Sequence, residues 1–187
     1  MAQPPALPIA TNPSTHHTFV DYTEPIPSLL PGLLVPQQVY RPQSAPGGFV
    51  RLDSIPFCHN GRIGIRLRDA VDSARIAGLY AAQSQPTLSE TGMRVTLRIL
   101  WPGYQEWRYE NGIDIFDHTY NANPQTLERI ANKVAKLIRT FCEEMTNANP
   151  AEPGWAVGAD TFNQLYLIEL RHVSKGSWQP VICWDRA

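Results

Sequence analysis

The sequence predicts an α+β fold, in which a mainly antiparallel sheet of about five to seven strands is packed by about two helices. Three observations carry this prediction. Residues 124–145 place apolar side chains every three or four positions, which is typical of a helix with one buried face. Residues 94–99 alternate between polar and apolar side chains, and residues 162–184 contain two apolar runs around a short turn, as expected of a hairpin.

Length and composition agree with one globular domain. The chain has 187 residues, of which 43% are hydrophobic and 18% are charged. This balance supplies a core and excludes a disordered, solvated polymer. The net charge of −1 removes the simplest sign of binding to nucleic acid or to an anionic membrane, which is a strongly basic chain.

Residues 1–48 are predicted to form an extended proline-rich arm, and residues 49–187 the globular domain. Ten of the seventeen prolines fall in the arm, where they disfavour regular helix. Apolar pairs interrupt its polarity, among them Leu29-Leu30 and Leu33-Leu34. We expect the arm to lie along a surface, either of its own domain or of a neighbouring copy. A flexible tail is the alternative.

Two strands and a helix are predicted between residues 49 and 82. Residues 49–58 and 63–65 are typical of strands around an Asn60-Gly61 turn, and Pro56 places the first strand at an edge or a bulge. Residues 67–82 carry apolar side chains at helical spacing, which predicts a short amphipathic helix.

A meander is predicted next. Its first strand covers residues 94–99 and ends before Trp101-Pro102-Gly103. Residues 105–110 and 113–116 flank Asn111-Gly112, a dipeptide that favours the tight turn of a β-hairpin.

The longest helix is predicted over residues 124–145, with Asn123 as its cap and Pro124 in its first turn. Residues 162–173 and 178–184 then pair as a final hairpin. The first of these two strands is apolar on both faces, which predicts a central place in the sheet beneath a covering helix.

Three segments share their order and spacing with a known group of proteins. They are residues 100–104 (Leu-Trp-Pro-Gly-Tyr), the helix after Asn123-Pro124 with its Val134-Ala135-Lys136, and residues 170–180. Together they resemble an uncharacterised group from mushroom-forming (basidiomycete) fungi, over roughly residue 49 onward. The resemblance implies an intracellular fungal protein and implies no activity and no site residues.

Asp114, Asp117 and His118 are the candidate catalytic residues. Two carboxylates and an imidazole are groups that a divalent metal or a general acid–base pair requires. The alternative is an ordinary exit from a strand into a loop, where Asp is common. Because no further ligand follows at a fixed spacing, we expect no metal site and no cofactor, and a metal-dependent hydrolase is a minority hypothesis.

Two sets of residues are candidates for binding. One is the basic face of the long helix, and the other is an aromatic group on the meander. Arginine and lysine rows can contact phosphates, and exposed aromatic rings can stack on bases or peptides. The alternatives are a solvated helix face and a set of core aromatics. The residues concerned are Arg129, Lys133, Lys136 and Arg139 on the helix, with Trp101, Tyr104 and Trp107 on the meander.

We expect a non-enzymatic interaction or assembly protein that uses the arm and a sheet edge to bind itself or a protein partner. Leu29, Leu30, Leu33 and Leu34 are the expected anchors. A nucleic-acid-binding or regulatory protein is the alternative. Three widely spaced cysteines, with no secretory signal and no apolar membrane span, predict an intracellular protein of the cytoplasm or nucleus.

Overall fold

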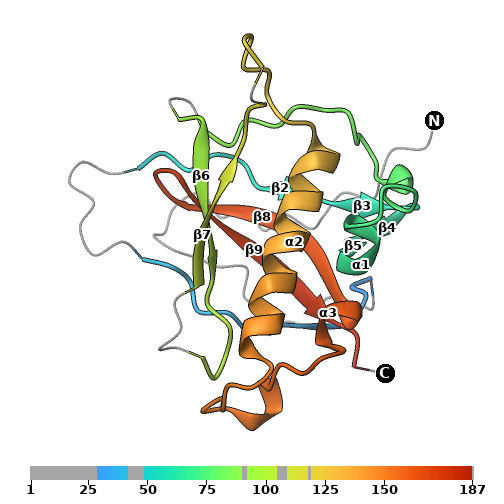
Figure 1. Ribbon diagram of the computed structural model, residues 1–187, viewed down its shortest axis with the longest axis vertical. Coiled ribbons are helices and arrows are strands. Elements are labelled where there is room, and N and C mark those ends of the chain that lie inside the picture. Colours follow the sequence, from blue (N-terminus) through green and yellow to red (C-terminus); the bar gives the residue numbers. More distant parts are fainter. Residues whose placement is uncertain (1–28, 42–48, 90–91, 105–108, 118, 187) are drawn as a thin grey trace.

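The computed structural model describes residues 29–41, 49–89, 92–104, 109–117 and 119–186. It contains a mixed seven-stranded sheet, a small second sheet and three α-helices, which confirms the α+β class (Figure 1). The strands are β1 (Leu33–Leu34), β2 (Ile55–Pro56), β3 (Cys58–His59), β4 (Arg62–Ile63), β5 (Ile65–Arg66), β6 (Arg94–Ile99), β7 (Tyr109–Asp114), β8 (Leu165–Ser174) and β9 (Ser177–Trp184). The helices are α1 (Leu67–Ala70), α2 (Leu127–Met145) and α3 (Thr161–Gln164), with 3₁₀ turns η1 (Ile76–Gly78) and η2 (Pro153–Trp155).

The antiparallel hairpin β8–β9 forms the centre of the sheet. The strand order is β2-β8-β9-β6-β7, and β5 and β1 extend the outer sides of β8 and β9 respectively. Gly176 turns the hairpin with a φ of 74°, a conformation that favours glycine. The final hairpin of the sequence prediction is confirmed, and the sheet is mixed because β6 runs parallel to β9.

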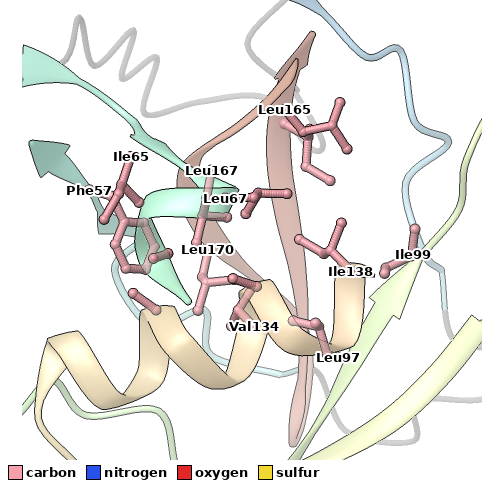
Figure 2. Packing of buried hydrophobic residues seen from close by; sticks show 14 of the residues in the cluster. Phe57, Ile65, Leu67, Leu97, Ile99, Val134, Ile138, Leu165, Leu167 and Leu170 are labelled. Carbon is pink, nitrogen blue, oxygen red and sulfur yellow. The ribbon is translucent and has the colours of Figure 1, made fainter. Parts of the chain in front are cut away.

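Helix α2 packs on one face of the sheet and forms the main core with it. Val134 and Ile138 project from α2 towards side chains of β6 and β8, such as Leu97 and Leu170 (Figure 2). All four side chains are fully buried. The apolar stripe of α2 explains this position, because a face with apolar residues every three or four positions must be removed from water.

The opposite face carries a smaller apolar cluster. Ile63, Ile168 and Cys183 are buried there, and Leu30 and Leu34 of the arm pack against them. The described part of the arm therefore covers the sheet face that α2 leaves open. Val35 goes further, since it is buried in the main core.

The Asn60-Gly61 turn is confirmed. It joins β3 and β4, and both of its residues have positive φ angles, 50° and 74°. Two consecutive residues in this conformation produce the twist that a tight antiparallel hairpin requires.

The predicted turn at Asn111-Gly112 is wrong. Both residues lie inside β7 and pair with Leu97 and Thr96 of β6. Arg94 explains the glycine, because a Cβ at Gly112 would lie 2.1 Å from Arg94 Nε. Gly112 thus leaves room for a side chain that crosses from the neighbouring strand.

The predicted helix over residues 67–82 is also wrong beyond its first turn. Asp72 Oδ1 accepts hydrogen bonds from the backbone N–H groups of Ala74 (2.9 Å) and Arg75 (3.4 Å). A side chain that binds the backbone in this way competes with helical hydrogen bonds. The helical part ends as α1 at Ala70, and the later residues form turns and η1.

Helix α2 begins at Leu127, three residues later than Pro124, where the sequence placed its start. Pro124 instead forms a β-bridge with Phe116. The first N–H groups of the helix are satisfied by a distant loop, since Leu127 N donates to Ser84 O (2.8 Å) and Glu128 N to Ala82 O (3.0 Å). Among the described residues, no helix has the length and apolar character to cross a bilayer.

Candidate functional site

The two candidate catalytic carboxylates have separate surroundings. Asp114 forms an ion pair with Arg94 (3.9 Å), and its backbone carbonyl accepts a hydrogen bond from Lys133 Nζ at 2.7 Å. His118 lies outside the described residues. Within those that are described, no three His, Cys, Asp or Glu side chains are grouped so that they could hold a metal ion. The catalytic hypothesis remains an untested prediction.

Asp117 organises the loop before α2. Its carboxylate accepts hydrogen bonds from Thr119 Oγ1 (2.6 Å), Asn123 N (2.9 Å) and Asn123 Nδ2 (3.2 Å). These bonds, that from Thr119 first, lower the pKa of Asp117 to about 2. Asn123 is thus a partner of Asp117, whereas the sequence predicted it to cap the helix. The contacts of Asp117 are those of a loop-forming residue.

Trp101 and Tyr104 are core residues, so the hypothesis that they form an exposed stacking surface is wrong. They are 1% and 2% exposed. Trp101 Nε1 donates to Trp155 O (2.9 Å), Tyr104 Oη accepts from Val157 N (3.0 Å), and both rings contact Phe141. Trp107 lies outside the described residues.

The basic face of α2 is divided between different partners. Lys133 is half-buried against the sheet, and this desolvation lowers its pKa. Arg139 is exposed and pairs with Glu143 one helical turn later (3.8 Å). Arg129 and Lys136 are exposed on the same side of the helix. Arg139 also lines a shallow groove of about 540 Å³ at the end of α2, together with Arg68, Cys142, Phe162 and Asn163.

The leucines of the arm dock on β9. Leu33 and Leu34 form β1 and pair with Trp184 and Cys183, and Val35 N donates to Ile182 O at 2.9 Å. Leu29 and Leu33 remain 62% and 55% exposed, whereas Leu30 and Leu34 cover the smaller apolar cluster.

Gly32 permits the close approach of this segment. A Cβ at Gly32 would lie 2.5 Å from Trp184 O and 2.8 Å from Asp185 N. Both are backbone atoms and cannot move aside cheaply. Any larger residue at position 32 would therefore push the segment away from β9.

Two glutamines fill a gap beside the middle of β9. On the side of β9 away from β8, β6 pairs with its first residues and β1 with its last, and among the described residues no strand pairs with those between them. Gln37 Nε2 donates to Pro180 O (2.6 Å), while Gln37 Oε1 accepts from Leu100 N (3.1 Å) just after β6. Gln179 reciprocates, donating through Nε2 to Gln38 O (2.7 Å) and accepting from Tyr40 N (3.2 Å). Residues 37–40 are thereby tied to both diverging strands.

Arg98 fixes the far end of the segment. Its Cζ lies 3.6 Å from the centroid of the Tyr40 ring, a cation–π contact. Its Nε donates to Ser177 Oγ (3.0 Å), and its guanidinium also pairs with Glu110. Tyr40 therefore packs against a guanidinium that residues of β6, β7 and β9 hold in place.

His172 fastens residues 49–52 at the start of the globular domain. Its ring stacks on Trp178 (4.8 Å) and meets the edge of Phe49 (5.0 Å), and its Nδ1 accepts a hydrogen bond from Leu52 N (2.9 Å). Nδ1 must carry no proton in order to accept. Burial, followed by the nearby charge of Arg51, lowers the pKa of His172, which favours this neutral form.

The sequence contained one overlooked sign of this docking site, which is Pro180. A proline cannot donate to a sheet ladder and is expected at an edge, and Pro180 lies within β9 opposite Leu170 of β8. Its position marks the stretch of β9 that has β8 on one side and no described strand on the other. Nothing in the local sequence of Gln37 or His172 indicated their bonds to Pro180 and Leu52, because these partners lie 143 and 120 residues away in the chain.

A family model described as a domain of unknown function, DUF6741, matches residues 52–184, which span both central strands and α2. No curated protein and no solved structure matches the chain. Since the match covers well over half of the sequence, the chain belongs to the DUF6741 family.

Proposed function

We propose that the protein is a non-enzymatic assembly protein in which residues 29–41 of one copy dock on β9 of a second copy. The observation that carries the proposal is the place of this segment in the sheet. It supplies β1, fills the gap between β9 and β6, and covers the apolar cluster of Ile63, Ile168 and Cys183.

Exchange between copies preserves every contact of the closed form. An identical segment from a neighbour offers the same leucines and the same Gln37, so the swapped and closed forms differ little in contact energy. The chain between the segment and the domain, residues 42–48, has the sequence Pro-Gln-Ser-Ala-Pro-Gly-Gly. A short connection of this kind is where a change of path converts a closed monomer into an exchanged dimer.

The exposed leucines support the same proposal. Leu29 and Leu33 are more than half exposed on the docked segment, and exposed apolar side chains on a sheet edge favour association. In this proposal residues 29–41 cover the sheet of their own chain in the closed form and the sheet of a second copy in the exchanged form.

A disulfide trap tests the exchange. Leu34 lies opposite Cys183, and because Val35 N bonds to Ile182 O, the Leu34–Cys183 pair is the closely spaced, non-hydrogen-bonded kind. A Leu34→Cys variant therefore places two thiols at disulfide distance. We expect oxidation to give a covalent dimer whose fraction on a non-reducing gel rises with protein concentration.

The double variant Leu34→Cys/Cys183→Ser is the matched control, because Cys58 and Cys142 are buried and unpaired in both proteins. It should give no dimer. A disulfide that forms only within monomers at every concentration, together with a monomeric mass by light scattering, contradicts strand exchange.

A nucleic-acid-binding function keeps one supporting observation, the exposure of Arg129 and Lys136 on α2. If it holds, the full-length protein binds a short DNA or RNA at low salt, and a Lys136→Glu variant shows weaker binding with a shallower salt dependence. Absence of binding at low salt disposes of this candidate.

Two broader assignments also belong to the proposal. The three cysteines are free and buried, and burial raises the pKa of Cys142 and Cys183 to about 12, which supports residence in a reducing, intracellular compartment. The resemblance of residues 100–104 and 170–180 to proteins of mushroom-forming fungi supports a fungal source.

A further inference from the structure

Arg186 lies in a wedge between two tryptophan rings. Its Cζ is 4.2 Å from the ring centroid of Trp155 and 4.1 Å from that of Trp184. The two rings are inclined by 48°, with centroids 6.1 Å apart. Arg186 Nη2 also donates to Gly154 O at 2.6 Å. The guanidinium thus meets two π faces and one carbonyl acceptor.

Contacts that do not involve Arg186 hold the ring of Trp184 and the backbone of Trp155. Trp184 Nε1 donates to Gln164 Oε1 (2.8 Å). The backbone of Trp155 is fixed at both ends of its peptide unit, because its N–H donates to Glu152 O (2.9 Å) and its carbonyl accepts from Trp101 Nε1 (2.9 Å). Since these contacts do not depend on Arg186, we expect the wedge to keep its shape when the arginine side chain leaves.

Arg186 itself is the replaceable part. Its side chain is exposed, while the preceding residue is anchored independently. Asp185 N donates to Gln164 O (2.9 Å), and the Asp185 carboxylate pairs with Arg66 (3.2 Å). The side chain of Arg186 can swing into solvent without moving the backbone that leads to it.

We propose that the wedge of Trp155 and Trp184 is a recognition site for an arginine side chain of a partner protein, and that Arg186 fills it as an internal substitute ligand. Aromatic faces attract a cation, most strongly when tryptophan supplies them. Gly154 O adds selectivity among cations, because only a cation that carries N–H donors can form a hydrogen bond to this carbonyl. Guanidinium has five such donors, whereas the trimethylammonium group of trimethyllysine has none.

The partner arginine binds by displacing Arg186. The glutamines that hold the arm take no part in this site. Trp184 pairs with Leu33 of β1 through its backbone, whereas it contributes its ring to the wedge, so failure of arginine binding would leave strand exchange standing. Conversely, a protein that never exchanges its arm can still bind arginine here.

An Arg186→Ala variant of the full chain tests the site, with N-acetyl-arginine methylamide as the probe. In ¹⁵N-labelled protein the five tryptophan indole signals report binding directly. We expect the indole signals of Trp155 and Trp184 to shift saturably in the variant and much less in the wild type, where Arg186 competes. The citrulline analogue, which is nearly the same shape but uncharged, should bind about tenfold more weakly.

Arg62→Ala is the matched control, since Arg62 is an exposed arginine that is distant from Arg186 in the sequence. This variant should bind the probe as the wild type does. The double variant Arg186→Ala/Trp155→Ala should lose the response of Trp184. If the double variant does not fold, the identity of the shifted indole signals in Arg186→Ala still locates the site.

Three results overturn the proposal. The first is the absence of any saturable shift in Arg186→Ala, and the second is equal binding of the arginine and citrulline probes. The third is binding of a trimethyllysine probe as tight as that of arginine, which removes the assigned role of Gly154 O.

Discussion

Gln37→Ala tests whether the arm segment completes the sheet in solution. Gln37 makes two bonds, one to Pro180 O and one from Leu100 N, at a half-buried position between β9 and β6. Each bond contributes on the order of 1 kcal/mol, and a buried group left without a partner costs about 1–3 kcal/mol. Because water can reach a half-buried site, we expect a loss of about 2 kcal/mol in the free energy of unfolding. For a chain of this size that corresponds to a fall in Tm of roughly 4–8 °C.

The neighbouring residue supplies the control. Gln38 is exposed and contributes only its backbone carbonyl to the contact with Gln179, so Gln38→Ala should lie within about 0.5 kcal/mol of the wild type. Urea denaturation gives the free energies of unfolding. Amide hydrogen exchange at Leu100 reports the bond from Leu100 N to Gln37, and the Leu100 amide should exchange faster in Gln37→Ala but not in Gln38→Ala. If both variants match the wild type in stability and in exchange at Leu100, residues 37–40 do not bridge the strands.

Three further predictions follow from single contacts. Gly32→Ala should cost about 1–3 kcal/mol and speed hydrogen exchange at Val35, because its Cβ meets the backbone at Trp184, whereas Gly154→Ala, with open space around it, should do neither. Phe141→Ala should cost about 3–5 kcal/mol in urea denaturation, since this buried ring contacts Trp101 and two tyrosines; a cost below 1 kcal/mol contradicts the packing. The folded-state pKa of His172 lies below the unfolded value of about 6.5, so the unfolded chain binds more protons between the two values and stability rises with pH through that window. Urea denaturation at acidic and neutral pH should show this rise in the wild type and a smaller one in His172→Gln; equal profiles would remove His172 as its cause.

Elements whose patterns repeat were predictable from the sequence. The alternation of residues 94–99 corresponds to β6 at both ends, and the apolar stripe of α2 was found because burial against a sheet imposes a helical period. Errors arose where one side chain overrides a local preference. Arg94 occupies the space above Gly112, and Asp72 takes the N–H groups that a longer helix would need.

The candidate sites were less predictable than the fold. Trp101 and Tyr104 have a composition and spacing that suit either a surface or a core, and the choice depends on Phe141, which comes from a helix later in the chain. The contacts of Gln37 and Arg186 likewise join residues that are distant in the sequence. A single sequence carries the periodicity of each element but not the pairing between elements.

The range of the family match gives the two proposals a common physical basis. It covers residues 52–184, so both the segment 29–41 and Arg186 lie outside it. In this chain they cover surfaces of the matched region. The segment covers the side of β9 that β8 leaves open, with the cluster around Cys183, and Arg186 covers the wedge of Trp155 and Trp184. Each covered surface has a defined chemistry, a strand edge in one case and a pair of π faces in the other. An external strand or an external arginine can take either place only by competing with a tethered internal one. The affinity of a partner then depends on the free energy needed to displace the chain's own segment or side chain. Gly32→Ala and Arg186→Ala each lower this free energy.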